Sequence, residues 1–226
     1  MTPDEERWFE QPGRYRILMD GRWELTDLAE MPNAFEQCYS FIYCFDTEVG
    51  PLSPERVAYA LQGYPWRGGF SYINIYAVLR NQIYWRDRPR VSEIKYASPG
   101  WIELALNPDV AVQVAKAVAA IATSSAVAAK SYAVATKALG QIKVEREKAK
   151  LSELKLTREQ DVELMKLCEQ HAKFLGFKSV KSLNEQTGNS EVTLRLLLAH
   201  HRRLRTLAEF AEEGKASLPE KYDQES

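Results

Sequence analysis

The sequence lacks most of the features that mark a common functional class. It has three cysteines and three histidines, and Cys38, Cys44 and Cys168 follow no disulfide or zinc-site spacing. The net charge is −1, so the chain has no overall basic field to attract a polyanion. It has no P-loop, no G-x-S-x-G and no strand-linked G-x-G-x-x-G. We therefore expect a non-enzymatic protein with no metal and no cofactor, although an active site assembled from distant residues leaves no such motif.

The first residues also lack the apolar segment of a signal peptide. Residues 1–6 read Met-Thr-Pro-Asp-Glu-Glu and are acidic, whereas a signal peptide has a basic start followed by an apolar run. The expected location is therefore the cytoplasm.

Aromatic residues become scarce after Asn107, and the charge balance changes from net acidic to net basic at the same place. Such a change in composition predicts a domain boundary. We expect an α+β protein with an aromatic-rich α/β domain at 1–107, a long central helix at 108–156, a helical C-terminal domain at 157–214 and a disordered tail at 215–226.

Turn residues predict two β-hairpins in the N-terminal domain. Asp20-Gly21 is flanked by β-forming residues, and a second hairpin is expected over 90–106, turning at Ser98-Pro99-Gly100. Helices are expected over 32–45, with Pro32 in the first turn, and over 54–62, with Ser53 as the N-cap.

Charge is nearly absent from the first part of the central helix. Asn107 is the expected N-cap, and from Pro108 to Ile142 the only charged residues are Asp109 and three lysines. Apolar and small residues recur with the 4-3 spacing of a coiled-coil seam. The seam residues are Val114, Val118, Ile121, Ser125, Ala128, Tyr132, Ala135, Leu139 and Ile142.

A helix that is apolar nearly all round must be buried. Two arrangements satisfy this requirement: a core helix of a monomeric domain, or a bundle of three or more copies of the chain. The 13 uncharged residues between Lys116 and Lys130 are fewer than the roughly 20 that span a bilayer. A constitutive membrane span is therefore not expected, and a span formed only after oligomerisation stays open.

Two basic clusters are candidate ligand surfaces. The first combines arginines, which bind phosphate through paired N–H groups, with aromatic rings on which bases stack. Its members are Arg80, Tyr84, Trp85, Arg86, Arg88 and Arg90. This spacing suits a nucleotide or short oligonucleotide, and the alternative is a loop in which Asp87 pairs locally.

The second cluster follows a segment that resembles a helix-turn-helix, with Gly188 at the turn and a recognition helix starting at Ser190. Its basic members are Arg195, His200, His201, Arg202, Arg203 and Arg205. Base contacts normally come from the start of a recognition helix, whereas this cluster lies two to three turns later. The alternative is a charged helix face paired with nearby glutamates.

The run Tyr96-Ala-Ser-Pro-Gly-Trp-Ile-Glu-Leu104, with the long apolar helix that follows, resembles a pattern in small bacterial effector proteins of phage-defence systems of the Hailong type. The resemblance implies a helical oligomer that is controlled by a nucleotide or oligonucleotide and acts on the membrane when activated. The leading hypothesis is thus a homo-oligomeric sensor or effector in antiviral defence. The alternative is a DNA-binding transcription regulator.

Overall fold

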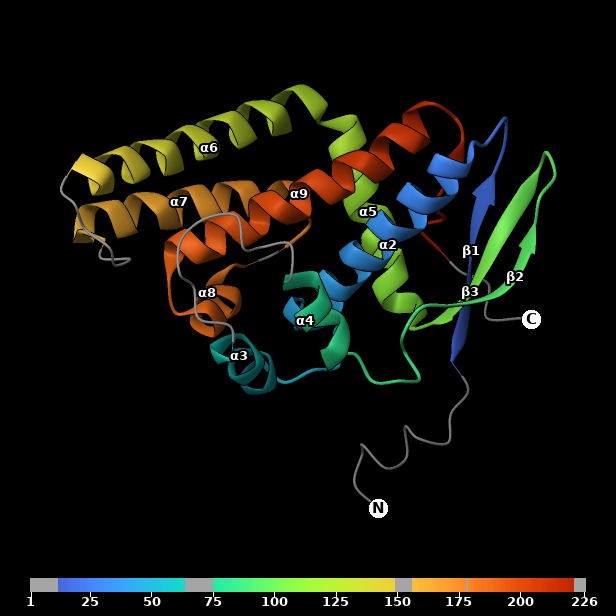
Figure 1. Cartoon of the computed structure of the whole chain (residues 1–226), viewed down its shortest axis with the longest axis horizontal. Helices are drawn as coiled ribbons and strands as arrows, with labels where there is room; N and C mark the ends of the chain where they lie inside the picture. Colours follow the sequence, from blue (N-terminus) through green and yellow to red (C-terminus); the bar gives the residue numbers. More distant parts are fainter. Residues whose placement is uncertain (1–11, 64–74, 149–155, 178, 222–226) are drawn as a thin grey trace, which may run out of the picture.

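The computed structural model describes residues 12–63, 75–148, 156–177 and 179–221, and it confirms the α+β class (Figure 1). A small antiparallel sheet lies at one end of a group of helices. The elements are β1 (Gly13–Met19), α2 (Leu25–Phe45), α3 (Pro54–Gln62), α4 (Ile75–Gln82), β2 (Arg90–Lys95), β3 (Gly100–Leu106), α5 (Pro108–Thr123), α6 (Ser125–Lys148), α7 (Arg158–Phe174), α8 (Lys181–Thr187), α9 (Ser190–Glu212) and β4 (Ala216–Ser217).

The four strands pair in the order β2-β3-β1-β4, and every neighbouring pair is antiparallel. The hairpin expected over 90–106 is confirmed as β2 and β3. In β1, Tyr15, Ile17 and Met19 are buried, while the residues between them face outward. This alternation turns one face of the sheet toward α2, where the rings of Tyr15 and Phe35 stack with centroids 6.1 Å apart.

The first expected hairpin is wrong. Gly21 does occupy a left-handed turn conformation, with φ of 67°, but no strand follows it. The Glu24 and Asp27 side chains form a capping box that starts α2 at Leu25. The edge of β1 that a hairpin partner would have taken pairs instead with β4, where Met19 lies opposite Ala216.

The tail expected to be disordered is therefore ordered in part. Ala216 and Ser217 form β4, and the Tyr15 hydroxyl donates a hydrogen bond of 2.8 Å to the carbonyl of Pro219. The Lys215 ammonium lies 3.1 Å from the Asp27 carboxylate. Residues 222–226 lie outside the described part of the chain.

Several helix boundaries agree with the expected caps. The Ser53 side chain caps α3 and Asn107 caps α5, as expected. Thr157 caps α7 in the same way. The start of α2 differs, because the helix begins at Leu25 and places Pro32 inside it rather than in its first turn.

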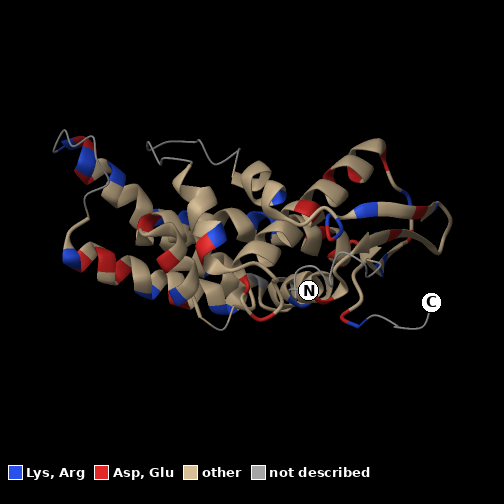
Figure 2. Cartoon of the chain, turned by 90° about the horizontal axis from the view of Figure 1, so that it is seen from below, with Lys and Arg blue, Asp and Glu red and all other residues tan. Residues whose placement is uncertain are grey.

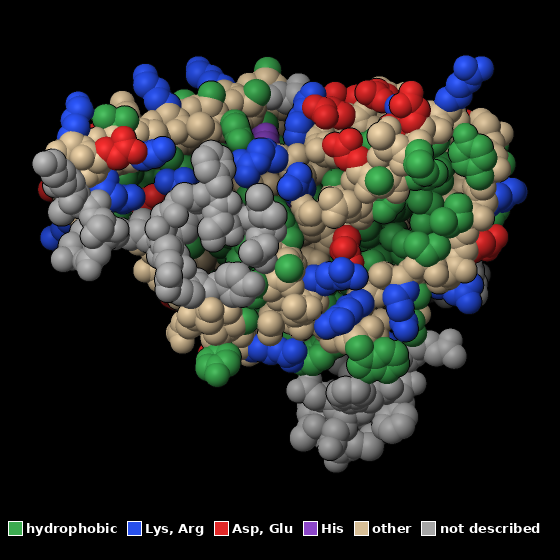
Figure 3. Space-filling model, viewed as in Figure 1, with side chains coloured by type: hydrophobic (Ala, Val, Ile, Leu, Met, Phe, Trp, Pro, Cys, Tyr) green, Lys and Arg blue, Asp and Glu red, His purple; other side chains and the backbone are tan. Residues whose placement is uncertain are grey.

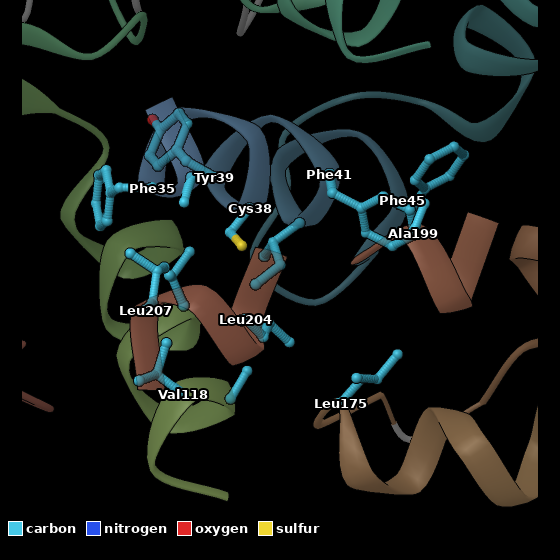
Figure 4. Close-up of a cluster of buried hydrophobic side chains, with 14 of the residues drawn as sticks. Phe35, Cys38, Tyr39, Phe41, Phe45, Val118, Leu175, Ala199, Leu204 and Leu207 are labelled. Carbon is cyan, nitrogen blue, oxygen red and sulfur yellow. The ribbon is translucent and has the colours of Figure 1, made fainter. Parts of the chain in front are cut away.

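The core is shared between the N-terminal and C-terminal parts of the chain. Helix α9 packs against α2, α5 and α7 and runs through the centre of the molecule (Figure 1). In the close-up, side chains of α2 such as Phe35 and Cys38 face Leu204 and Leu207 of α9, with Val118 of α5 beside them (Figure 4).

The long central helix is divided in two, which corrects the single helix expected at 108–156. Helix α5 ends at Thr123, and α6 continues at an angle of 94° to it. At the break, the hydroxyls of Thr123 and Ser124 donate hydrogen bonds to the backbone carbonyls of Ala119 and Ala120. Side-chain hydrogen bonds of this kind compete with the helical ladder and bend helices. Three consecutive hydroxyl residues, 123–125, thus mark the bend.

The two halves of the divided helix are buried to different degrees. Helix α5 lies within the core, where Val114, Val118 and Ile121 are at most 3% exposed. Helix α6 buries one stripe against α7 and α9, formed by Ala128, Ala135, Leu139 and Ile142. The expected seam is therefore covered by helices of the same chain. The side chain of Ser125, also assigned to the seam, lies outside the described residues.

Within the described residues, no single helix is long and apolar enough to cross a membrane. Helices α5 and α6 together meet that criterion of length and composition, but as a pair with the sharp bend between them.

Candidate ligand-binding site

The arginine and aromatic cluster expected to bind a ligand lies on the last turn of α4 and the segment leading to β2. Most of its guanidinium groups already have protein partners. Arg80 lies 2.9 Å from the Glu36 carboxylate, and Arg88 donates to the carbonyl of Ile83 at 3.3 Å. Figure 3 shows basic side chains gathered on this part of the surface. The charges are therefore partly neutralised by contacts within the fold.

Asp87 organises the middle of this segment. The residue is 2% exposed, and its carboxylate accepts a hydrogen bond of 2.7 Å from the Tyr43 hydroxyl and pairs with Arg86 at 3.1 Å. The Tyr39 hydroxyl donates to the Asp87 carbonyl and accepts from the backbone N–H of Asn107. Burial raises the pKa of both tyrosines, so they stay protonated as donors. This contact anchors the segment to α2 and places Arg86 in a structural role.

The two aromatic members of the cluster differ. Tyr84 is half-buried and packs against the core, with the Arg56 guanidinium 4.7 Å from its ring centroid. Trp85 is 53% exposed, and the Arg90 guanidinium lies 5.5 Å from its ring. The Trp85–Arg90 pair is thus the part of the cluster that lies open to solvent.

The start of α9 does not present the surface that a recognition helix needs. Ser190 is 1% exposed, and its hydroxyl donates a hydrogen bond of 2.6 Å to Asp161 of α7. Thr193 and Leu194 are fully buried. Glu191 is also fully buried, and its carboxylate binds both Arg195 and Arg146 at 2.8 Å. The residues that would read bases are therefore packed inside the protein.

The members of the second basic cluster lie on different faces of α9. His200 points into the core, where it packs against Phe41 and Phe177. The Arg203 guanidinium lies 5.8 Å from the ring of Tyr76. His201, Arg202 and Arg205 instead face α6. The charged surface is mixed in sign throughout the helices (Figure 2).

An open pocket of about 650 Å³ lies where α6 meets α9, directly beside the bend. Three helices contribute to it, and one wall is apolar and built mainly of alanines. The lining residues are Ile121, Ala126, Ala128, Ala129, Tyr132, His201, Arg202, Arg205, Thr206 and Glu209. Six of these ten were singled out from the sequence, but in two unrelated sets, as seam residues and as basic residues.

The polar side of the pocket is formed by α9. Arg202 donates to the Tyr132 hydroxyl at 3.0 Å, and the rings of Tyr132 and His201 lie 5.0 Å apart. Arg205 pairs with Glu209 at 3.0 Å, a contact between partly exposed side chains. Two guanidinium groups and two aromatic rings therefore share one recess.

His201 has an unpaired polar atom buried beside this recess. The residue is 6% exposed, and its buried Nδ1 atom has no hydrogen-bond partner within the described part of the chain. Burial, and then the nearby charges of Arg205 and Arg202, lower the pKa of His201 to about 4. The imidazole is thus neutral at pH 7 and adds no charge to the recess.

All three histidines of the chain meet at this contact or next to it. The His171 ring lies 4.9 Å from His201, and its Nδ1 atom is 3.1 Å from the Ser131 hydroxyl. Burial lowers the pKa of His171 to about 3, far below the value that suits a general base near pH 7. Within the described residues no carboxylate hydrogen-bonds His171, and no cluster is arranged to hold a metal.

Comparisons with models of protein families, with curated proteins and with solved structures find no significant match to this chain.

Proposed function

We propose that the protein is a non-enzymatic sensor that binds a small nucleotide in the pocket between α6 and α9. The observation that carries this proposal is the convergence of Arg202, Arg205, Tyr132 and His201 on one recess with an alanine-rich wall. Its volume of about 650 Å³ falls in the range of small-molecule sites. A mononucleotide or dinucleotide fits this size, and a duplex does not.

Each part of a nucleotide has a matching group in the pocket. The two arginines supply paired donors for phosphate, and the ring of Tyr132, supported from behind by His201, supplies a surface on which a base stacks. Glu209 and Glu212 oppose the phosphate, because both pair with Arg205. Breaking an exposed ion pair costs only about 0–1 kcal/mol, so the phosphate can take the place of these two carboxylates.

The position of the pocket supports a sensing role. Ile121 comes from α5, whereas Tyr132 comes from α6, so a bound ligand contacts both sides of the bend at Ser124. A ligand that prefers one angle between α5 and α6 shifts the protein toward it. The wider hypothesis is that the protein assembles into homo-oligomers and acts at a membrane in antiviral defence. In that hypothesis, the ligand-dependent change in the angle between α5 and α6 is the signal.

Isothermal titration calorimetry of the full chain tests the proposal. The probes are the four ribonucleoside monophosphates and the dinucleotide pApA, with inorganic phosphate and adenosine as fragments. We expect at least one nucleotide to bind more tightly than either fragment. The double variant Arg202→Gln/Arg205→Gln should weaken that binding tenfold or more, because it removes both phosphate donors.

A matched control is Arg22→Gln, which changes an exposed arginine outside the pocket and should leave the affinity unchanged. Absence of binding by every nucleotide would overturn the proposal. Binding that survives the double variant would overturn it as well, because the nucleotide would then occupy another surface.

A further inference from the structure

Strand β2 forms an edge of the sheet that no described element covers. It stands last in the order β2-β3-β1-β4, and all six of its residues are exposed. An edge strand presents unpaired backbone N–H and C=O groups on its outer side, and another strand can pair with them.

A β-bulge gives this edge an apolar face. Val91 lies opposite Leu104 and Glu93 lies opposite Glu103, so Ser92 is the extra residue between them. Because of the bulge, Val91 and Ile94 both point to the face of the sheet that carries the core residues of β3.

This apolar face is left uncovered. Val91 is 58% exposed, Ile94 is 56% exposed, and Tyr96, just beyond the strand, is 65% exposed. Figure 3 shows hydrophobic side chains gathered over the sheet and the nearby part of α2. A contiguous exposed apolar patch of this kind marks an interaction surface.

We propose that β2 pairs antiparallel with β2 of a second copy of the chain, about a two-fold axis through Ile94. The two four-stranded sheets then join into one continuous sheet. Each copy offers the same strand to the other, as a two-fold interface requires. The apolar patches around Ile94 of the two copies meet on one face of the joined sheet.

The charges on β2 select this register. Residues directly opposite each other in an antiparallel pair have their side chains on the same face of the sheet. Successive residues of one strand point to opposite faces, so a two-fold axis between two residues would place them opposite each other on different faces. The axis must therefore pass through a residue. An axis through Glu93 places two glutamates opposite each other, and an axis through Lys95 places two lysines opposite each other. An axis through Ile94 places Glu93 of each copy opposite Lys95 of the other.

The surroundings of Glu93 explain why a partner's lysine is favourable there. Within its own sheet, Glu93 lies opposite Glu103, which is also a carboxylate. Arg14 and Arg16 bind Glu103 at 3.1 and 2.7 Å, whereas Glu93 has no ion pair among the described residues. The second copy supplies the missing cation twice, once on each side of the axis.

Lysine at a strand edge often prevents pairing, but in a single copy the Lys95 side chain lies over its own sheet, and in the proposed dimer it turns from there to Glu93 of the partner subunit. In the single copy, the Lys95 ammonium lies 4.4 Å from the centroid of the Trp101 ring, over β3 of its own sheet. The backbone of β2 thus stays accessible to a second strand.

Sedimentation equilibrium of the full chain, with variants that change only exposed side chains, tests this interface. We expect a dimer for the wild-type chain at micromolar concentration. Ile94→Asp should raise the dissociation constant at least tenfold, because it places two carboxylates on the axis. Circular dichroism checks that the variant keeps its fold.

A charge exchange identifies the register. Glu93→Lys alone places lysine opposite lysine, and Lys95→Glu alone places glutamate opposite glutamate, so each should weaken the dimer tenfold or more. The double variant Glu93→Lys/Lys95→Glu restores both pairs and should recover most of the affinity.

The control is Val134→Asp on the exposed side of α6, which should leave the dimer unchanged. A monomeric wild-type chain would overturn the proposal. It would also be overturned by a dimer that Val134→Asp disrupts and Ile94→Asp does not, or by a charge exchange that fails to restore pairing.

Discussion

The imidazole of His200 stacks on the ring of Phe41, with 4.2 Å between the centroids and 8° between the ring planes. The ring of Phe177 meets the rings of Phe41 and His200 edge-on, and its centroid lies 6.1 Å from that of His200. His200 is fully buried, and neither of its nitrogen atoms has a hydrogen-bond partner in the described structure. The imidazole of His200 thus packs as a hydrophobic ring would, and its two unpaired nitrogen atoms lower the stability of the fold.

Replacing His200 with phenylalanine should stabilise the protein. An unsatisfied buried polar group costs about 1–3 kcal/mol, and Phe keeps a flat ring in the stack. We expect His200→Phe to raise the free energy of unfolding at pH 7 by about 1 kcal/mol, measured by urea denaturation. A lower stability would show that a nitrogen of His200 makes a favourable contact in solution.

Acid should destabilise the fold below pH 6.5. Burial lowers the pKa of His171 and His200 to about 3 and that of His201 to about 4, against 6.5 for an ordinary histidine. Unfolding therefore takes up protons between pH 6.5 and about 3, so the contribution to stability is full above 6.5 and falls as the pH falls through this window. Urea denaturation at half-unit steps of pH measures the slope.

The variant His200→Phe should make this slope shallower by about one proton, or roughly 1.4 kcal/mol per pH unit. An unchanged slope in the variant would contradict the assignment of one of the three protons to His200. The exposed substitution Glu30→Gln serves as the control and should leave the slope as it is in the wild-type chain.

Local signals in the sequence predicted much of the fold. The caps at Ser53 and Asn107 were correct because one side chain satisfies backbone groups within a few residues. The hairpin after Asp20-Gly21 was wrong because the partner of β1 comes from Ala216 and Ser217, far along the chain. Turn chemistry holds no information about that pairing.

The candidate site was harder to predict than the helices that build it. A regular 4-3 repeat predicted one straight helix, and the bend between α5 and α6 brings Tyr132 against α9. The hydroxyl run at 123–125 was a signal for the bend, but its strength depends on packing. Six lining residues were recognised, and only the tertiary fold shows that they share one pocket.

Removing the carboxylate of Asp87 should destabilise the protein strongly. Asp87 is buried, accepts from Tyr43 and pairs with Arg86, and breaking a buried pair costs about 3–5 kcal/mol. We expect Asp87→Ala to lower the free energy of unfolding by about 3 kcal/mol, whereas Glu30→Ala on the exposed side of α2 changes little. A loss below about 1 kcal/mol would show that this cluster is not an anchor.

The same reasoning applies to Arg86, which the sequence assigned to a ligand site. Arg86→Ala leaves the Asp87 carboxylate buried without that pair and should also destabilise the fold. A loss of ligand binding in this variant would therefore need a check of folding, and Arg90→Ala at the exposed Trp85 stack is the cleaner test of that surface.

Arg146 should control the mobility of α6. Near the C-terminal end of α6, Arg146 pairs with the buried Glu191 of α9 at 2.8 Å. Near the pocket, the Tyr132 hydroxyl of α6 accepts a hydrogen bond of 3.0 Å from Arg202 of α9. Besides these contacts, α6 buries only a narrow stripe and makes side-chain hydrogen bonds to α7, between Ser131 and His171 and between Glu145 and Gln160, so the buried Arg146–Glu191 pair is a main tie of its end. Glu191 keeps Arg195 when Arg146 is removed, which limits the cost to the rest of α9.

We expect Arg146→Gln to speed amide hydrogen exchange across 126–148 by tenfold or more, while exchange in α5 stays as in the wild-type chain. Mass spectrometry of the exchanged protein measures both regions at once, and Lys143→Gln, an exposed change on the same helix, is the control. Faster exchange in α5 and α6 alike would mean that the two helices open as one unit. In that case the bend at Ser124 would not separate a stable helix from a mobile one, and a ligand in the pocket would act on both together.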